Sequence, residues 1–376
     1  MKALVAGAGI AGLATGIALR RAGHDVEIFE RSRELREIGA GLMIWPNGMR
    51  ALKSIDVKVR MLVVNKITLR NSRGRRLTEL AVDGVLERYG FNVAFVHRAD
   101  LQSALARSFG QKLLHLGCEV RAFVQGRDAV EVTLGDGSAR SADLLVGADG
   151  LRSAVRRQLL GDGDPLYLGS TVWRGLAPGE GIDLPIGDGV NWVGHGSEFV
   201  AFHLAGGQIY WAAVTKEEHG AKPGSEGTKH DVLERFFTWA EPVPALIRAT
   251  EEAAILRNDM YDRRPSIRWS HGRVTLVGDA AHPMTPNQGQ GACQALEDGI
   301  ALGESLAQTA SITPALELYE RRRVGRANRM VRISRQATRG VQIDNPVLCA
   351  IRDRVLSLIP RPMILATQDA TMRADR

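Results

Sequence analysis

The sequence predicts an α/β protein in which a Rossmann-like nucleotide-binding domain is interleaved with an antiparallel-sheet domain and followed by a C-terminal helical segment. Three observations predict this fold class. The N-terminus reads as strand, glycine-rich turn and helix, two later apolar strands end at Asp149 and Asp279, and the middle of the chain holds short alternating strands. A chain of 376 residues also exceeds one typical core, which favours two interlocked domains.

The N-terminal unit, "KALVAGAGIAGLATGIALRRAGHDVEIFE", carries a spaced glycine triplet, Gly7, Gly9 and Gly12, and its second strand ends at Glu30. Gly7 permits a tight turn, Gly9 lets a pyrophosphate approach the backbone, and Gly12 lets the helix pack closely on the strand. Phosphates would then lie at the helix N-terminus, where free amides favour anions. Glu30 follows at the position of an acid that binds a ribose, so the unit predicts a dinucleotide site.

Two more segments repeat this plan. "DLLVGADGLRSAVRRQL" is an apolar strand that ends at Asp149 and Gly150 before a helix. "RVTLVGDAAHPMTPNQGQGACQALEDG" delivers Asp279 and then a glycine-rich helix start. Because parallel strands present their carboxyl ends at one edge of a sheet, three such strand ends indicate one extended ligand along that edge.

Composition excludes several other classes. A hydrophobic content of 44% with 24% charged residues is typical of a soluble globular protein, and no uncharged apolar run is long enough to span a membrane. Cys118, Cys293 and Cys349 are distant from one another and odd in number. They argue against a disulfide framework and a thiolate metal site, so we expect no metal and a cytoplasmic location.

The net charge of +7 is concentrated towards the C-terminus, where arginines recur at helical spacing at positions 322, 326, 329 and 332. Nucleic acid or an anionic membrane could bind such a stripe, but a solvated helix face is the preferred interpretation. No nucleic-acid motif accompanies it. The later segment "VLCAIRDRVLSLIP" has Leu348, Ile351, Val355 and Leu358 at helical spacing. A helix covering the core is preferred there over a membrane-surface helix.

The order and separation of "GAGIAGL" with Glu30, "GADGLRS" and "GDAAHPMTPNQGQGACQALEDG" resemble the single-component FAD-dependent monooxygenases, the aromatic-hydroxylase group that contains para-hydroxybenzoate hydroxylase. "GAGLMIWPNGMRAL", "HRADLQSAL" and the C-terminal "NPVLCAIRDRVLSLIP" extend the resemblance over nearly the whole chain. The branch it suggests includes urate hydroxylase, 2-alkyl-quinolone hydroxylase and zeaxanthin epoxidase.

This resemblance implies roles for particular residues. Asp279 would bind the ribityl chain of FAD, the turn from Pro286 to Ala292 would lie against the flavin ring, and Arg98 would contact the pyrophosphate. Arg31 would flank the adenosine, whereas His282 is interpreted as a structural member of its turn. The expected FAD-binding residues are Gly7, Gly9, Gly12, Glu30, Arg31, Gly41, Arg98, Asp149, Asp279, Gly289, Gly291 and Ala292.

The resemblance also implies an activity. NADH or NADPH would dock transiently and reduce FAD, and the reduced flavin would react with O2 to give a flavin 4a-hydroperoxide that hydroxylates or epoxidises an electron-rich, aromatic small molecule. The absence of a second glycine triplet disfavours flavoenzymes with two dinucleotide domains. A flavin-dependent halogenase or reductase and a non-catalytic flavin-binding protein are the alternatives. A monomer and a homodimer both remain open.

The substrate residues are expected in the middle sheet. A urate hydroxylase would place an arginine and a tyrosine on adjacent strands there; Tyr210 matches the tyrosine, but the arginine position falls near Glu198, which disfavours urate itself. The expected catalytic residues are Tyr210, Glu198 and Pro286, and the expected substrate-binding residues are Trp173, Trp192, Phe202, Tyr210 and Trp211.

The domains are expected to alternate along the chain. Residues 1–66, 97–165 and 268–345 would form the FAD-binding domain, 67–96 and 166–267 the substrate domain, and 346–376 a C-terminal helix and tail.

Overall fold

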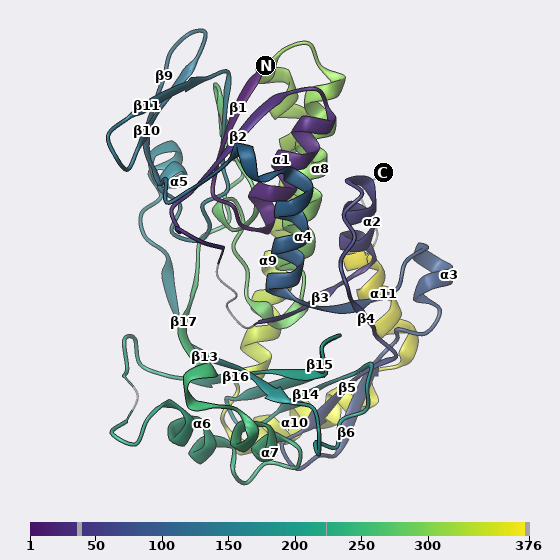
Figure 1. Cartoon of the computed structure of the whole chain (residues 1–376). Helices are drawn as coiled ribbons and strands as arrows, with labels where there is room; N and C mark the ends of the chain where they lie inside the picture. The colour runs from purple at the N-terminus through teal and green to yellow at the C-terminus, as the bar shows by residue number, and fades with distance from the viewer. Residues whose placement is uncertain (36–39, 223, 373–376) are drawn as a thin grey trace.

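The computed structural model describes residues 1–35, 40–222 and 224–372. One main sheet lies beside the upper part of a set of long helices in Figure 1, and a second lies across their lower end. The first sheet has six strands in the order β18-β19-β12-β1-β2-β8. All its pairs are parallel except β18 with β19. The strands are β1 Lys2–Ala6, β2 Asp25–Glu30, β8 Leu114–Leu116, β12 Leu144–Gly147, β18 Ser270–His271 and β19 Val274–Leu276.

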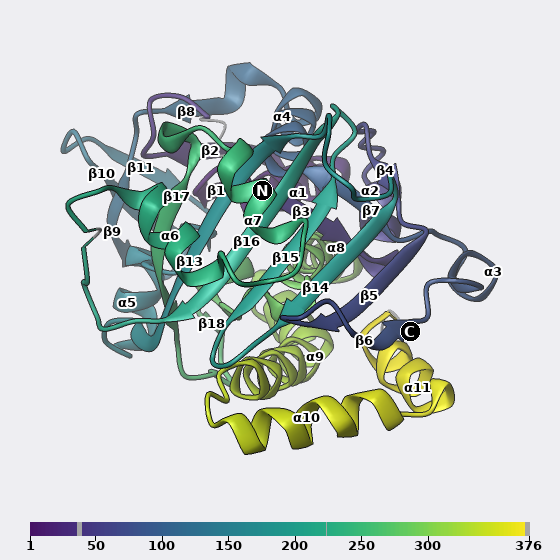
Figure 2. The same cartoon turned by 90° about the horizontal axis from the view of Figure 1, so that it is seen from below.

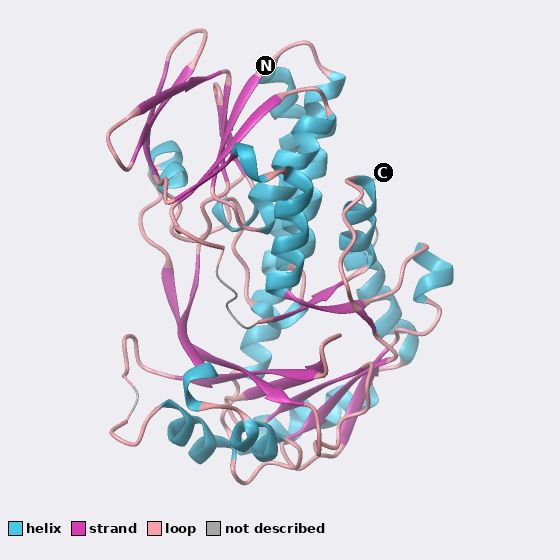
Figure 3. Ribbon diagram, in the orientation of Figure 1, coloured by secondary structure: helices cyan, strands magenta, loops and turns pink. Residues whose placement is uncertain are grey.

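The central strands of this sheet are buried on both faces, as expected from their unbroken apolar sequences. Four helices, α1, α4, α8 and α9, run alongside one another next to the sheet (Figure 3). The contact between α1 and α8 depends on glycine, because a Cβ on Gly299 would lie 2.7 Å from the Thr15 nitrogen. The helices are α1 Ile10–Arg21, α4 Arg98–Phe109, α5 Ala154–Leu160, α8 Gly291–Gln308 and α9 Ile312–Val341.

The second sheet has seven strands in the order β17-β13-β16-β15-β14-β5-β6 and lies across the lower end of the helices in Figure 1. Its pairs are antiparallel except β14 with β5. The outward face packs on α6 Thr228–Phe236 and α7 Val243–Ala249, which form a separate core with it. The strands are β5 Lys66–Asn71, β6 Arg76–Leu80, β13 Leu166–Pro178, β14 Asp188–Val193, β15 Glu198–His203, β16 Gln208–Lys216 and β17 Leu256–Asp262.

Smaller elements complete the fold. One three-stranded sheet is built from β3 Gly41–Ile44, β7 Ala94–His97 and β4 Leu62–Val63, and another from β9 Val120–Gln125, β10 Val130–Leu134 and β11 Ala139–Ala142. The inner face of the seven-stranded sheet contacts the first of these, because Phe202 of β15 stacks on Phe95 of β7 at a centroid distance of 4.0 Å. The predicted fold class is confirmed. The remaining helices are α2 Pro46–Ser54, α3 Val85–Tyr89, α10 Pro346–Leu358 and α11 Arg361–Met372.

Two expectations for the C-terminal region are corrected. The arginine stripe is not one solvated face, because Arg326 is buried and pairs with Glu297 of α8, while Arg329 and Arg332 are exposed. The helix predicted to cover the core does not do so. Leu348, Ile351, Val355 and Leu358 all lie on the outside of α10, each more than half exposed. None of the helices in the described ranges has the length and apolar character needed to span a bilayer.

Candidate active site

The glycine-rich turn between β1 and α1 has the shape of a phosphate cradle. Gly7 has φ +103°, and a Cβ there would lie 2.4 Å from the Ala148 carbonyl oxygen. A Cβ on Gly12 would lie 1.9 Å from the Gly7 oxygen, so the helix is in direct contact with the turn. Around Gly9, by contrast, nothing lies within 4 Å of the Cβ position. The turn therefore packs tightly against the protein at Gly7 and Gly12 and leaves free space for a ligand at Gly9.

Two side chains hold this turn from either side. Glu30 accepts a hydrogen bond from the Ala8 amide at 2.8 Å and another from the Ser32 amide at 2.9 Å. Gln102 of α4 donates to the Ala8 carbonyl oxygen at 2.8 Å. Arg31, next to Glu30, is exposed. The end of β2 and the start of α4 thus fix the backbone whose amides face an incoming anion.

Arg98 and Asp279 reach the same region from two different elements. Neither side chain makes a hydrogen bond or ion pair within the described part of the chain. Asp279 is open to solvent on one side, yet desolvation by the surrounding protein raises the pKa of its carboxyl, against the charges of His282 and Arg98. Burial lowers the pKa of Arg98, an effect that Asp279 opposes. A carboxylate and a guanidinium are thus left available for a polar ligand.

The turn before α8 is the third part of the candidate site. Pro286 is exposed at the start of the short η4 segment, Pro286–Gln288, and Gly289 follows with φ +59°. A Cβ on Gly289 would lie 2.9 Å from the Met43 methyl carbon, so this turn lies against β3. Gly291 and Ala292 begin α8, whose first turn contains no acidic side chain. The positive end of an 18-residue helix is therefore not neutralised by its own residues.

These residues fit FAD. The open position at Gly9 suits a pyrophosphate, Glu30 is at the end of β2 where a ribose is bound, and Asp279 can accept hydrogen bonds from a polyol chain. The start of α8 offers backbone amides to the pyrimidine side of a flavin ring. Among the residues that the structure describes, no group of His, Cys, Asp or Glu side chains is placed to hold a metal ion.

Asp149 has a different environment from Asp279. Its carboxylate accepts hydrogen bonds from the Ser153 hydroxyl and from the Ala154 and Val155 amides at 2.8 Å and 3.2 Å. It therefore closes the first turn of α5. Burial raises the pKa of Asp149, and these hydrogen bonds oppose the rise. Its predicted contact with FAD stays a prediction.

His282 is a structural residue of the turn. It is 1% exposed, and its Nε2 lies 2.5 Å from Asp298 of α8. Asp298 also accepts from the Gly278 amide and from Arg323 of α9. Burial alone would raise the pKa of Asp298, but the charges of His282 and Arg323 outweigh it, and the pKa is lowered. This network ties the turn after β19 to α8 and α9.

The inner face of the seven-stranded sheet carries Phe202 and Tyr210. Both rings lie against β3, because a Cβ on Gly41 would be 2.7 Å from Phe202 and 2.6 Å from Tyr210. Gly41 was expected to bind the cofactor; the structure places it against these two rings. Burial raises the pKa of Tyr210 to about 12, although nearby Arg174 lowers it. The Tyr210 hydroxyl makes no hydrogen bond with the described residues.

Arg174 is a candidate that the sequence reasoning missed. It lies on β13, opposite Ala212 of β16 and next to the Leu176–Tyr210 pair. One Nη donates to Asn258 at 2.5 Å, while the buried Nε has no partner in the described chain. An arginine and a tyrosine therefore do lie on adjacent strands of this face, but the arginine comes from β13 and not from the expected position near Glu198 on β15. The only sequence signal was an arginine within "STVWRGLAP".

Glu198 is buried on the inner face of β15, and its carboxylate is fully engaged. Asn191 of β14 and Asn287 of the η4 turn each donate to it at 2.5 Å. The Thr338 hydroxyl of α9 lies 2.6 Å from the Asn287 side-chain oxygen. Burial raises the pKa of Glu198 to about 6, and the two asparagines oppose this. Glu198 thus connects the sheet to the turn before α8.

The three tryptophans expected to bind substrate do not face this site. Trp173, Trp192 and Trp211 are at most 2% exposed and belong to the core beneath α6 and α7. The indole nitrogens of Trp173 and Trp211 donate there to Thr215 and Thr250. Because side chains alternate along a strand, Tyr210 and Trp211 point to opposite faces. The three tryptophans therefore lie on the face of the sheet opposite Tyr210, and their contact with substrate stays a prediction.

A dinucleotide cradle at the edge of a parallel sheet, under an antiparallel sheet with a polar inner face, defines the class of FAD-dependent hydroxylases. The family model described as "FAD binding domain" matches residues 1–164 and 192–334. The chain belongs to this family and is an FAD-dependent monooxygenase, for which NADH or NADPH is the electron donor.

Relatives with known activities support this assignment. The chain is 38% identical to aurachin C monooxygenase/isomerase of Stigmatella aurantiaca, over 95% of this chain and 94% of that protein. It is 33% identical to FAD-dependent urate hydroxylase of Klebsiella pneumoniae, over 88% of both chains. A solved structure of Klebsiella pneumoniae HpxO complexed with FAD and uric acid matches with a TM-score of 0.92 at 30% identity, covering 99% of this chain and 96% of that one.

Proposed function

We propose that this monooxygenase oxygenates an electron-rich aromatic small molecule held between the turn 286–292 and the inner face of the seven-stranded sheet. The observation that carries the proposal is the pair Tyr210 and Arg174, whose phenol O–H and buried Nε have no partner among the described residues, on a face where the Glu198 carboxylate is already occupied by two asparagines. A buried unpaired donor such as the Arg174 Nε–H costs free energy unless a ligand accepts its hydrogen bond. The Nε–H of Arg174 and the O–H of Tyr210 are both donors, so they favour a substrate whose ring carries an oxygen or a deprotonated atom.

Bound FAD would supply electron transfer from NADH or NADPH and the transfer of one oxygen atom from O2. The chain's own residues orient the acceptor. Arg174 would donate from Nε to a substrate oxygen, which stabilises its anion and makes the adjoining ring more electron-rich. Tyr210 stays protonated at neutral pH and would donate its O–H. Phe202 and Phe95 would exclude water from one side of the ring.

Glu198 has a positioning role in this proposal. Both of its oxygens are occupied by asparagine amides, so it acts through Asn287 on the turn beside the flavin site. The argument against urate, a carboxylate where an arginine was expected, loses force because Arg174 supplies a guanidinium on the same face. One relative is named as a urate hydroxylase and a similar solved structure holds uric acid, which supports purines as the first compounds to test, with phenols and quinolones beside them.

The test is an NAD(P)H oxidation assay on the purified yellow protein with phenols, quinolones, purines and polyenes, while peroxide is quantified. A substrate should accelerate NAD(P)H loss without matching peroxide and gain one oxygen by mass. Arg174→Gln should lower kcat/KM for that substrate roughly 10- to 100-fold, since a hydrogen bond to a charged group is lost. Arg257→Gln is the matched control, because Arg257 lies over Trp173 on the outer face of the sheet.

If none of these compounds accelerates NAD(P)H loss while the protein still binds FAD, the proposed substrate class is wrong. If Arg257→Gln lowers kcat/KM as much as Arg174→Gln, the assignment of the inner face as the substrate face is wrong.

A further inference from the structure

Helix α10 presents apolar side chains to solvent. Val347, Leu348, Ile351, Val355 and Leu358 are between 52% and 67% exposed. At 3.6 residues per turn, these five positions fall within one arc of about 100°. We call them the α10 apolar face. Met363, near the start of α11, is also 61% exposed. Contiguous exposed apolar surface of this kind marks an interaction site.

The inner side of α10 is fastened to the protein by polar contacts. Asn345 caps the helix by accepting from the Val347 and Leu348 amides at 3.0 Å and 3.2 Å. Arg352 donates to the Gly194 carbonyl oxygen at 2.9 Å and pairs with the buried Asp353. The helix thus has polar contacts inside and apolar side chains outside, the reverse of a helix that covers a core.

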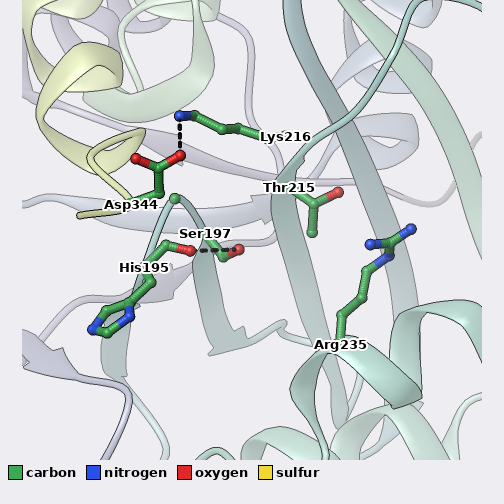
Figure 4. A pocket seen from close by; sticks show the side chains of 7 residues that line it. His195, Ser197, Thr215, Lys216, Arg235 and Asp344 are labelled. Carbon is green, nitrogen blue, oxygen red and sulfur yellow. Dashed lines mark hydrogen bonds and ion pairs between the residues drawn. The ribbon is translucent and has the colours of Figure 1, made fainter. Parts of the chain in front are cut away.

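The start of α10 is also held at a shallow hollow of about 260 Å³ beside the seven-stranded sheet. Figure 4 shows Lys216 of β16 pointing at Asp344, with which it pairs at 2.7 Å. At the other end of the helix, Arg361 pairs with Asp83. Fixed at both ends, α10 lies along the outside of the molecule beyond α9 (Figure 2). Its apolar face is therefore a defined surface of the folded protein.

The charges around this face are positive. Arg354 is exposed beside Val347 and Leu358 on the helical wheel and has no partner in the described chain. Arg332 and Arg339, on the part of α9 that leads into α10, are also exposed, and neither pairs with a carboxylate in the described part of the chain. The only acid in α10, Asp353, is buried. Apolar side chains bordered by arginine are typical of helices that lie in a lipid interface.

We propose that the α10 apolar face docks the enzyme onto the surface of an anionic lipid bilayer, with α10 parallel to the membrane plane and Arg354 at the level of the lipid phosphates. This inference goes beyond the proposed catalytic function and does not depend on it. A second copy of the chain is a less suitable occupant, because self-association would bring the same arginines together in a protein of net charge +7.

The test is flotation of the FAD-loaded enzyme with vesicles of phosphatidylcholine alone and of phosphatidylcholine mixed with phosphatidylglycerol. The wild type should float with the anionic vesicles and release at high salt. Ile351→Glu should weaken vesicle binding at least about tenfold, because it places a charge in the buried part of the interface. Arg354→Gln should weaken binding to the anionic vesicles by about fivefold and leave binding to neutral vesicles unchanged.

The matched control is Ile267→Glu, the same change at an isoleucine that is 79% exposed on a loop away from α10. All variants should keep their FAD content and melting temperature, because the replaced side chains face solvent. Failure of the wild type to bind anionic vesicles overturns the proposal, and so does equal weakening by Ile267→Glu and Ile351→Glu. Sedimentation provides a third test of the proposal. A wild-type dimer that Ile351→Glu dissociates into monomers would show that a second copy of the chain, and not a membrane, covers the α10 apolar face.

Discussion

Replacing Glu198 with glutamine changes the pH dependence of stability by an amount that follows from its environment. Glu198 is 6% exposed, and burial raises its pKa from 4.5 to about 6. The difference, about 1.5, corresponds to roughly 2 kcal/mol of free energy. Because the folded-state pKa lies above the unfolded one, the contribution of Glu198 to stability is fully present below about pH 4.5 and is lost as the pH rises through about 6.

Glutamine cannot ionise, so Glu198→Gln does not suffer this loss. Asn287 is fixed by Thr338 and can keep donating to the remaining carbonyl oxygen. Asn191 has a buried side-chain oxygen without a partner, and rotation of its amide lets that oxygen accept from the new glutamine. We expect the unfolding free energy of the variant, relative to wild type, to rise by about 2 kcal/mol between about pH 4 and about pH 7.5.

The measurement is chemical unfolding of the FAD-loaded protein over that pH range, followed by circular dichroism. Glu234→Gln, at an exposed carboxylate of α6, controls for the loss of one negative charge. A difference between Glu198→Gln and wild type that stays constant with pH would refute the reasoning, since it would mean that Glu198 titrates at the same pH in the folded and unfolded chains.

Three further predictions concern five other substitutions. Gly9→Val should leave the apo-protein folded but weaken FAD binding, measured by flavin fluorescence. Gly12→Ala should lower the melting temperature even without FAD, because its Cβ would lie 1.9 Å from the Gly7 backbone oxygen. Asp298→Asn should cost about 3–5 kcal/mol in unfolding free energy, because a buried arginine and a buried histidine lose their shared carboxylate. Tyr210→Phe should lower kcat/KM with little change in melting temperature. Trp211→Phe, on the opposite face of the same strand, should lower the melting temperature with little change in kcat/KM. Equal effects of the two substitutions on kcat/KM would contradict the assignment of the sheet faces.

The nucleotide-binding half of the molecule was predictable because its signals are local. The turn around Gly7 and Gly9, the acid at Glu30 and the strand end at Asp279 each depend on a few consecutive residues. Parallel order then brings them to one edge without any knowledge of side-chain packing. The fold class and a dinucleotide site could therefore be stated from these local signals, and the resemblance to FAD-dependent monooxygenases identified the dinucleotide as FAD.

The substrate face could not be predicted in the same way. Both faces of the seven-stranded sheet are buried, so the apolar pattern of β16 does not distinguish Tyr210 from Trp211. Arg174 was missed because it lies close to Tyr210 only through the pairing of β13 with β16, and these two strands are distant in sequence. For α10 the spacing identified an apolar face correctly, but helical periodicity does not say whether that face points towards the core or towards solvent.

The strand end at Asp149 and the strand end at Asp279 are connected through helix α5. This connection explains the environment of Asp149. Asp149 closes the first turn of α5, and α5 carries Arg156, which is fully buried. Arg156 donates to the carbonyl oxygens of Ala280 and Ala281 at 3.0 Å and 2.7 Å, directly after Asp279. The backbone that aims Asp279 at the flavin site is therefore held by a helix whose start depends on Asp149. Asp149 would therefore support FAD binding through the backbone that holds Asp279, separately from its own predicted contact with FAD.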